Sequence, residues 1–485
     1  MSLATTRARR FTRHLRLERG SRSPESGGLL WVVGSEATAG AVGFFVLVHQ
    51  ARSLGPSSFA ALEYAGAVMA WMLVLVRGGM DVIVYREAAR RPRLVGRLTQ
   101  LLIGLRLVAA SVGYLLIMAV AATAGAERAG ALLVAGLSLF ASAWVADVGL
   151  RASCRVKELA ASQALRAFGT AGAVYLCVRG PSDLMKAALC LVVGEVLGAV
   201  VPCWRHCREH GWTMPGLRKR AALVIAKRGA VTGLTRFVRV TLYGLDLLAL
   251  GWWAGSEFGP YAASRRLVFA MVAIGLVVPA VLGPRIARAW CEGVGPTRKL
   301  IGDSLAMTWA IGLPAAIGLG LTAERWMPLL FGEAYRQGGP WLALLASRLP
   351  WLLTATFAQA ALIACRREDW SLRLAFGQLA AALVLLPFSI WGAGAWGVGW
   401  VLNLVEMGGA VGGWVLLSRL KIAPGISATI LRPFVGCLAM CVVCGMTKSD
   451  PLPVVVVAAA AAYGLAWRVC ARRSLTPSVP RGVAR

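Results

Sequence analysis

The chain has 485 residues, of which 58% are hydrophobic and only 15% are charged, and its mean hydropathy is positive. Apolar runs of about 20 residues recur between short basic breaks, which is typical of a polytopic membrane protein and excludes a soluble fold. The formal net charge of +30 does not indicate nucleic-acid binding, because the basic residues alternate from one loop to the next. We therefore expect no nucleic-acid partner.

The apolar runs predict an all-α membrane protein with about fourteen transmembrane helices. They lie at residues 29–48, 59–85, 101–123, 131–150, 163–179, 184–203, 229–254, 267–284, 303–323, 341–364, 374–391, 395–417, 433–446 and 454–470. No break between them is long enough for a soluble catalytic domain. We therefore expect that the protein is not an enzyme.

The distribution of arginine and lysine predicts the orientation. Basic residues gather in the arm before the first span and in alternate breaks, at 86–97, 151–157 and 205–220, whereas the other breaks hold few. By the positive-inside rule these basic segments, and both termini, are cytoplasmic. The basic arm is expected to bind anionic membrane lipids.

A short repeat indicates two related halves. Leu54-Gly55-Pro56 follows the first span and Phe258-Gly259-Pro260 follows the seventh, each at an outer helix end. The repeat predicts two lobes of six helices, as is common in transporters. The expected segments are a basic cytoplasmic arm (1–28), the first lobe (29–203), a cytoplasmic interlobe loop (204–228), the second lobe (229–417), two additional transmembrane helices (418–470) and a cytoplasmic tail (471–485).

Arg77, Arg239 and Arg348 fall inside predicted spans. A guanidinium is costly in hydrocarbon and cannot be neutralised by losing its proton, so each must face the bundle interior or a wet cavity. A cationic cavity in a bundle of many helices indicates a transporter whose cargo is negatively charged.

In the seventh span the polar residues Thr232, Arg236, Arg239, Tyr243 and Asp246 alternate at steps of four and three. At about 100° per residue they stay within roughly 80° of arc, so one face of this helix is polar. Such a face lines a cavity or forms a seam of salt bridges between helices, and the sequence leaves both readings open.

The first and second spans carry further candidates for the cavity wall. Glu36 lies on a face of small and polar residues in the first span, and Arg77 and Asp81 share a face of the second. Because Arg77 and Asp81 are four residues apart, they could also neutralise each other.

Two acids, Glu195 and Glu406, lie deep within predicted spans. Carboxylates at that depth suit coupling to H⁺ or Na⁺, and they serve equally well as packing partners for arginine. Asp147, nearer the inner end of the fourth span, is expected to pair with loop arginines.

Cys203, His206, Cys207 and His210 lie at intervals that a metal could use. No second ligand pair with zinc-finger spacing follows, and arginines interleave. We therefore expect neither a metal site nor a cofactor.

The succession of these motifs resembles the polysaccharide and O-antigen flippase family, in the superfamily of multidrug exporters and the lipid-linked peptidoglycan-precursor flippase. The matching stretches are Leu54-Gly55-Pro56, Gly79-Met80-Asp81-Val82, Tyr85-Arg86-Glu87-Ala88-Ala89-Arg90, Asp246-Leu247-Leu248-Ala249-Leu250-Gly251, Gly259-Pro260-Tyr261-Ala262-Ala263 and Leu329-Leu330-Phe331-Gly332-Glu333-Ala334-Tyr335.

The resemblance implies a V-shaped bundle of two six-helix lobes, a central cationic cavity and alternating access. The implied cargo is an oligosaccharide on undecaprenyl diphosphate, moved across the bacterial cytoplasmic membrane for O-antigen, lipopolysaccharide or exopolysaccharide biosynthesis. Other polysaccharide assembly proteins are implied as partners. The arginines of the cavity would bind the diphosphate.

Two other functions compete with this one. A multidrug or cation exporter of the same superfamily would need acids and aromatic residues in its cavity. The arginines on the polar faces of the spans argue against this function. A membrane glycosyltransferase or sugar-chain polymerase is the enzyme alternative, but the first outer loop, 49–58, has no carboxylate.

The predicted orientation can be tested with topology reporters. A periplasmic reporter fused at Gly332 should be active, and a cytoplasmic reporter should be active at Arg366, because the positive-inside rule places these positions on opposite sides. The reverse pattern would contradict the whole topology.

Overall fold

The computed structural model describes residues 26–211, 215–216, 219–253, 255–447 and 450–473, which form helices and connecting turns without a strand. The α-helices are α2 (Ser26–Arg77), α3 (Met80–Arg90), α4 (Val95–Ala122), α5 (Ala126–Gly136), α6 (Ser138–Ala143), α7 (Val148–Ala152), α8 (Val156–Cys177), α9 (Leu184–His210), α10 (Lys219–Trp253), α11 (Phe258–Gly275), α12 (Val277–Glu292), α13 (Val294–Leu321), α14 (Ala323–Phe331), α15 (Gly338–Ala346), α16 (Leu349–Ala364), α17 (Glu368–Arg419), α18 (Ile426–Met446) and α19 (Leu452–Arg473). Short 3₁₀ turns are η1 (Pro92–Leu94), η2 (Pro181–Asp183) and η3 (Glu333–Tyr335).

The described residues contain 8 helical stretches long and apolar enough to cross a membrane. Two of these stretches each hold two passes, because the chain leaves the helical conformation at Gly55 within α2 and at Gly394 within α17. The more polar α8 and α10, together with α18 and α19, bring the described chain to fourteen passes. This confirms the multi-pass membrane fold that the sequence predicted.

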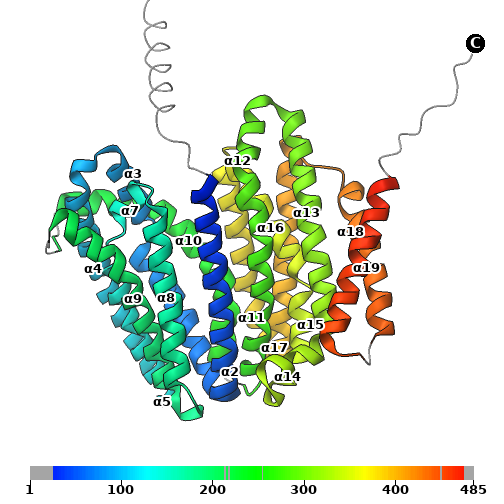
Figure 1. Ribbon diagram of the computed structural model, residues 1–485, viewed down its shortest axis with the longest axis horizontal. Helices are drawn as coiled ribbons and strands as arrows, with labels where there is room; N and C mark the ends of the chain where they lie inside the picture. Colours follow the sequence, from blue (N-terminus) through cyan, green and yellow to red (C-terminus); the bar gives the residue numbers. More distant parts are fainter. Residues whose placement is uncertain (1–25, 212–214, 217–218, 254, 448–449, 474–485) are drawn as a thin grey trace, which may run out of the picture.

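The passes form two bundles and a C-terminal pair (Figure 1). The N-terminal lobe comprises α2 to α9 and the C-terminal lobe comprises α10 to α17, while α18 packs against α13 and α19 packs against α18. α2 contacts both α8 of its own lobe and α10 and α11 of the other. Figure 1 shows the two lobes spreading apart toward the end that carries α3, α7 and α12, which is the V shape that the family resemblance implied.

The repeated Gly-Pro turns of the two halves touch each other at the narrow end of the V. A Cβ atom on Gly259 would overlap the backbone of Pro56, including its carbonyl oxygen. The hydroxyl of Tyr335 donates to the carbonyl of Ala51 over 2.8 Å, and Nε of Arg52 donates to the carbonyl of Leu330 over 2.7 Å. These contacts hold the turn between the first two passes against the C-terminal lobe.

A second glycine contact joins the lobes near the opposite end. The chain turns at Gly79, between α2 and α3, with φ 76°, a conformation that glycine adopts without strain. A Cβ atom there would lie 2.6 Å from the carbonyl oxygen of Gly229, and one on Gly233 would lie 2.5 Å from the carbonyl oxygen of Gly78. α2, α3 and α10 therefore approach backbone to backbone.

The helices differ from the apolar runs at several places. The predicted fourth span, 131–150, leaves the helical conformation after α6, at 144–147, before α7 begins. Helix also enters the segment 204–228 from both sides, because α9 ends at His210 and α10 begins at Lys219. Hydropathy measures the apolar portion of a helix, whereas hydrogen bonding continues into the polar region. Most of the predicted arm and tail, 1–25 and 474–485, lies outside the described residues.

The glycine contact between the lobes can be tested by adding one methyl group. Gly79→Ala should lower the free energy of unfolding by about 2 kcal/mol, because alanine is strained at this φ and its Cβ would press on α10. The melting temperature of the purified protein in detergent measures the effect. Gly40→Ala is the control, since no atom outside the backbone of its own helical turns lies within 4 Å of the added Cβ; equal melting temperatures for the two variants would contradict the close packing.

Candidate functional site

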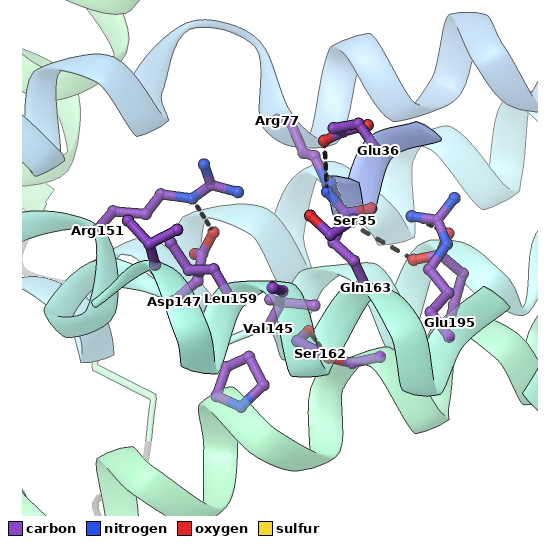
Figure 2. A pocket seen from close by; sticks show the side chains of 15 residues that line it. Ser35, Glu36, Arg77, Val145, Asp147, Arg151, Leu159, Ser162, Gln163 and Glu195 are labelled. Atoms are coloured by element: carbon purple, nitrogen blue, oxygen red, sulfur yellow. Dashed lines mark hydrogen bonds and ion pairs between the residues drawn. The ribbon is translucent and has the colours of Figure 1, made fainter. Parts of the chain in front are cut away.

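A polar cavity of about 220 Å³ lies inside the N-terminal lobe, and we call it the N-lobe cavity. Charged and polar side chains from α2, α8 and α9 and from the turn before α7 reach it (Figure 2). Its lining residues include Ser35, Glu36, Arg77, Asp147, Arg151, Ser162, Gln163, Arg166 and Glu195. Figure 2 shows Asp147 and Arg151 at one end of the cavity and Glu195 at the other.

Glu195 of α9 binds two arginines from different helices. Arg77 Nη2 at the end of α2 lies 3.6 Å from Glu195 Oε2, and Arg166 Nη1 of α8 lies 3.1 Å from Glu195 Oε1. The Arg77 side chain is 33% exposed and that of Arg166 is 50% exposed, whereas Glu195 is 14% exposed. Two guanidiniums thus share one carboxylate and keep free surface toward the cavity.

Beside this cluster, Gln163 Nε2 donates to Glu36 Oε1 over 2.7 Å. A second cavity of about 300 Å³ shares Gln163, Arg166 and Glu195 with the first and has mostly small and apolar walls. Gly66 lines the second cavity and lies next to the guanidinium of Arg266. The two cavities together run from the arginine pair to the face of the C-terminal lobe.

Arg266 of α11 crosses between the lobes to Glu63 of α2, with Nε 2.7 Å from Oε2. Glu63 is buried, whereas 41% of the Arg266 side chain is exposed. Neither residue was among the site candidates of the sequence analysis, and Arg266 lies at the start of an apolar run.

A buried ion network anchors the broken end of the fourth pass. Arg106 of α4 is 1% exposed; its Nη2 lies 2.8 Å from Asp81 Oδ1 and 3.6 Å from Asp147 Oδ1. Its Nη1 donates to the carbonyl of Val145 over 2.7 Å, where the helix has ended. Asp147 also binds Arg151, which the sequence analysis placed in a loop and which lies in the short helix α7. Asp81 therefore pairs with Arg106 rather than with Arg77.

Sequence reasoning missed Arg106 even though it interrupts an apolar run as Arg77 does. The signal was a lone arginine between Leu105 and Leu107 in the predicted third span. Arg106 is not part of a polar face of its own helix, because its partners come from other helices.

The residues on the polar face of α10 lie in several different environments. Arg236 is exposed and Arg239 is half-buried beside Tyr243. The hydroxyl of Tyr243 lies 3.0 Å from Thr356 Oγ1. Asp246 is 1% exposed and forms an ion pair of 2.7 Å with Nε of Arg265.

Arg348 and Glu406 lie in the interior of the C-terminal lobe. Arg348 is 2% exposed, and its Nε and Nη1 have no hydrogen-bond partner among the described residues. Its guanidinium lies 5.5 Å from the ring centre of Phe269, above which Arg265 also lies, at 4.3 Å. Glu406 is buried and accepts a hydrogen bond from Gln378 over 3.3 Å.

The structure thus separates the residues that the sequence analysis grouped as one cationic cavity. Arg77, Glu36 and Glu195 meet in the N-lobe cavity. Arg236, Arg239, Tyr243 and Asp246 on α10 belong to the C-terminal lobe, as do Arg348 and Glu406. Within that lobe, Arg348 and Arg265, the partner of Asp246, lie beside the same ring of Phe269.

Among the described residues, no group of three or more histidine, cysteine or acidic side chains has a geometry that could hold a metal ion. His206 and His210 stack on each other with ring centres 5.0 Å apart.

Known structures with this arrangement of helices are membrane transporters. The lipid II flippase MurJ, in an inward closed conformation, matches with a TM-score of 0.76 and 13% identity over 92% of this chain and 100% of that chain. An inward-facing multidrug resistance MATE family transporter of the MOP superfamily matches with a TM-score of 0.64 and 16% identity over 79% of this chain and 94% of that chain. An outward-facing transporter of the same MATE family matches with a TM-score of 0.55 and 15% identity over 83% of this chain and 96% of that chain. No curated protein matched the sequence.

These likenesses define the class: a multi-pass membrane protein with the fold of the MOP superfamily transporters. Residues 50–338, more than half of the chain, match the family described as polysaccharide biosynthesis protein. The chain belongs to this family, which confirms the resemblance drawn from its motifs.

The buried network around Arg106 should be essential for folding. Arg106→Ala leaves the carboxylates of Asp81 and Asp147 without their shared partner and should cost about 3–5 kcal/mol of unfolding free energy. Abundance in membranes and melting temperature measure the loss. Arg86→Ala, which removes an exposed arginine of the neighbouring α3, should leave both unchanged; an Arg106→Ala protein as stable as this control would contradict a structural role.

Proposed function

We propose that this protein is a flippase that moves an undecaprenyl-diphosphate-linked oligosaccharide across the bacterial cytoplasmic membrane for surface polysaccharide biosynthesis. The observation that carries the proposal is the pair of partly exposed arginines, Arg77 and Arg166, inside a polar cavity of a multi-pass membrane protein. Its membership of the polysaccharide biosynthesis protein family supports a glycan cargo.

The chemistry of the cavity suits a diphosphate. Guanidinium groups bind phosphate oxygens through charge-assisted, often paired hydrogen bonds, and they keep their charge at any depth in the membrane. Arg77 and Arg166 come from α2 and α8, so they approach a bound anion from two sides. Arg266 adds a third positive group at the boundary of the lobes.

An apolar groove supports the lipid half of the proposed cargo. This groove, of about 610 Å³, lies between α2, α11, α13, α18 and α19. Its walls include Phe44, Met271, Pro314, Met440 and Tyr463. A polyprenyl chain can lie against such a surface, whereas the polar head of the cargo cannot enter hydrocarbon and needs polar surroundings such as those of the N-lobe cavity.

The proposed mechanism is alternating access, in which the lobes rock about their contacts. The described arrangement resembles inward-facing relatives more than an outward-facing one, with TM-scores of 0.64 and 0.55 for the two MATE conformations. The arginine-rich loops support the proposal that both termini are cytoplasmic. Glu406, buried beside Gln378, is the proposed site for a coupling H⁺ or Na⁺.

Multidrug export is the second candidate, because MATE transporters share the fold. A cation exporter would hold acids without neighbouring arginines in its cavity. In the N-lobe cavity, Glu195 is occupied by Arg77 and Arg166, which disfavours a cationic cargo.

Proposed partners of the flippase are anionic membrane lipids and other polysaccharide assembly proteins.

Arginine substitutions test the proposal. Arg77→Ala and Arg166→Ala should each reduce glycan export by about a hundredfold, the order expected when charge-assisted contacts to phosphate are lost. Lysine should restore activity only in part, because a point charge lacks the fork geometry of guanidinium. The assay is translocation of the lipid-linked oligosaccharide by purified protein in liposomes, with membrane abundance measured in parallel.

Arg336→Ala is the control, since Arg336 is exposed at η3 and pairs only with its neighbour Glu333 among the described residues. Normal transport by both cavity variants at normal abundance would contradict the proposed function. Export of organic cations by the wild-type protein would favour the multidrug alternative.

A further inference from the structure

Glu195 holds Arg77 and Arg166, two of the arginines of the N-lobe cavity, in an arrangement that an anionic cargo would use. Its two carboxylate oxygens each face a different guanidinium, with Arg77 at 3.6 Å and Arg166 at 3.1 Å. Both arginines retain exposed surface, and Nε of Arg77 has no hydrogen-bond partner among the described residues. The carboxylate therefore occupies the point where the two positive groups converge.

A phosphate group has the same recognition chemistry as this carboxylate. Both present anionic oxygens to guanidinium N–H donors, and both accept from two arginines at once. The N-lobe cavity and its neighbour adjoin Glu195, so the space beside it is open to a ligand. A ligand phosphate and the Glu195 carboxylate would compete for the same donors.

We propose that Glu195 is an internal competitor of the cargo: it fills the diphosphate position in the empty transporter and leaves it when the lipid-linked diphosphate binds. The inference rests on the proposed flippase function and assigns one residue a specific part in it. Glu195 sets the affinity of the site and drives release of the cargo by returning to the arginines.

This role differs from that of a structural ion pair in one measurable respect. The apparent affinity of a ligand is reduced by the fraction of the protein whose site is free to bind, and a variant that removes the competitor regains that loss. Removal of a structural partner would instead disorder the arginines and weaken binding. The two roles therefore predict changes of opposite sign.

Glu36 provides a matched control within the same cavity. It is also a carboxylate on the cavity wall, but it accepts from the Gln163 amide and forms no ion pair with an arginine in the described part of the chain. Glu36→Gln and Glu195→Gln change the net charge equally. Only Glu195→Gln vacates the arginine donors.

The experiment measures binding of inorganic pyrophosphate to the purified full-length protein in detergent by calorimetry. Glu195→Gln should bind pyrophosphate about tenfold more tightly than the wild type, a change worth about 1.4 kcal/mol, and Glu36→Gln less than about threefold more tightly. Glu195→Asp keeps the charge but is one methylene too short to hold both arginines, so it should bind with intermediate affinity and serves if the Gln variant does not fold.

The tighter binding of pyrophosphate by Glu195→Gln must depend on Arg77 and Arg166. In a background of Arg77→Ala and Arg166→Ala, Glu195→Gln should no longer tighten binding, which is the coupling expected of groups that share one site. In the liposome assay, Glu195→Gln should lower the KM for the lipid-linked oligosaccharide and also lower the turnover rate, because release has lost its competitor.

The outcomes separate this inference from the function on which it rests. Wild-type binding of pyrophosphate that is lost in the arginine variants, with unchanged or weaker binding by a folded Glu195→Gln protein, would overturn the competitor role alone. Equal tightening by Glu36→Gln and Glu195→Gln would also overturn it, since net charge would then explain the effect. Arginine variants that transport the oligosaccharide normally would overturn the proposed flippase site itself.

Discussion

Arginine keeps its positive charge at every depth of a membrane, and a guanidinium shielded from water is stable only beside an anionic or hydrogen-bonding partner. Much of the interior of this protein is organised around that requirement. Carboxylates from other helices meet four of the buried or half-buried arginines and thereby fix which helices are neighbours. These pairs are Arg106 with Asp81, Arg265 with Asp246, Arg266 with Glu63, and Arg77 with Glu195.

The ratio of charges distinguishes the structural pairs from the candidate site. Arg106 is enclosed between two carboxylates, so its donors are used and the network holds α3, α4 and the turn before α7 together. Around Glu195 the ratio of carboxylates to arginines is reversed, because two partly exposed arginines share one carboxylate beside an open cavity. An excess of exposed donors is what an anionic ligand requires.

The contacts between the lobes suit a transporter whose halves move as rigid bodies. At Gly79 and at Gly259 the lobes approach through backbone, without a bulky side chain at these two points. The ion pair between Glu63 and Arg266 is a charged link across the same boundary, and its arginine remains partly exposed. Small residues at such a boundary permit close approach without locking the helices together.

The sequence by itself determined the number of passes, the two lobes and the family, because hydropathy, loop charge and the repeated Gly-Pro turn are local properties of the chain. It also identified Arg77 and Glu195 as buried charges of interest. Only the tertiary structure decided their partners: Asp81, four residues from Arg77 and a plausible partner along one helix, binds Arg106 instead. Pairing depends on which faces of distant helices meet, and at the break of the fourth pass the carbonyl of Val145 accepts a hydrogen bond from Arg106 of another helix. Neither is encoded in the periodicity of a single span, because the partners of these groups lie far away in the chain.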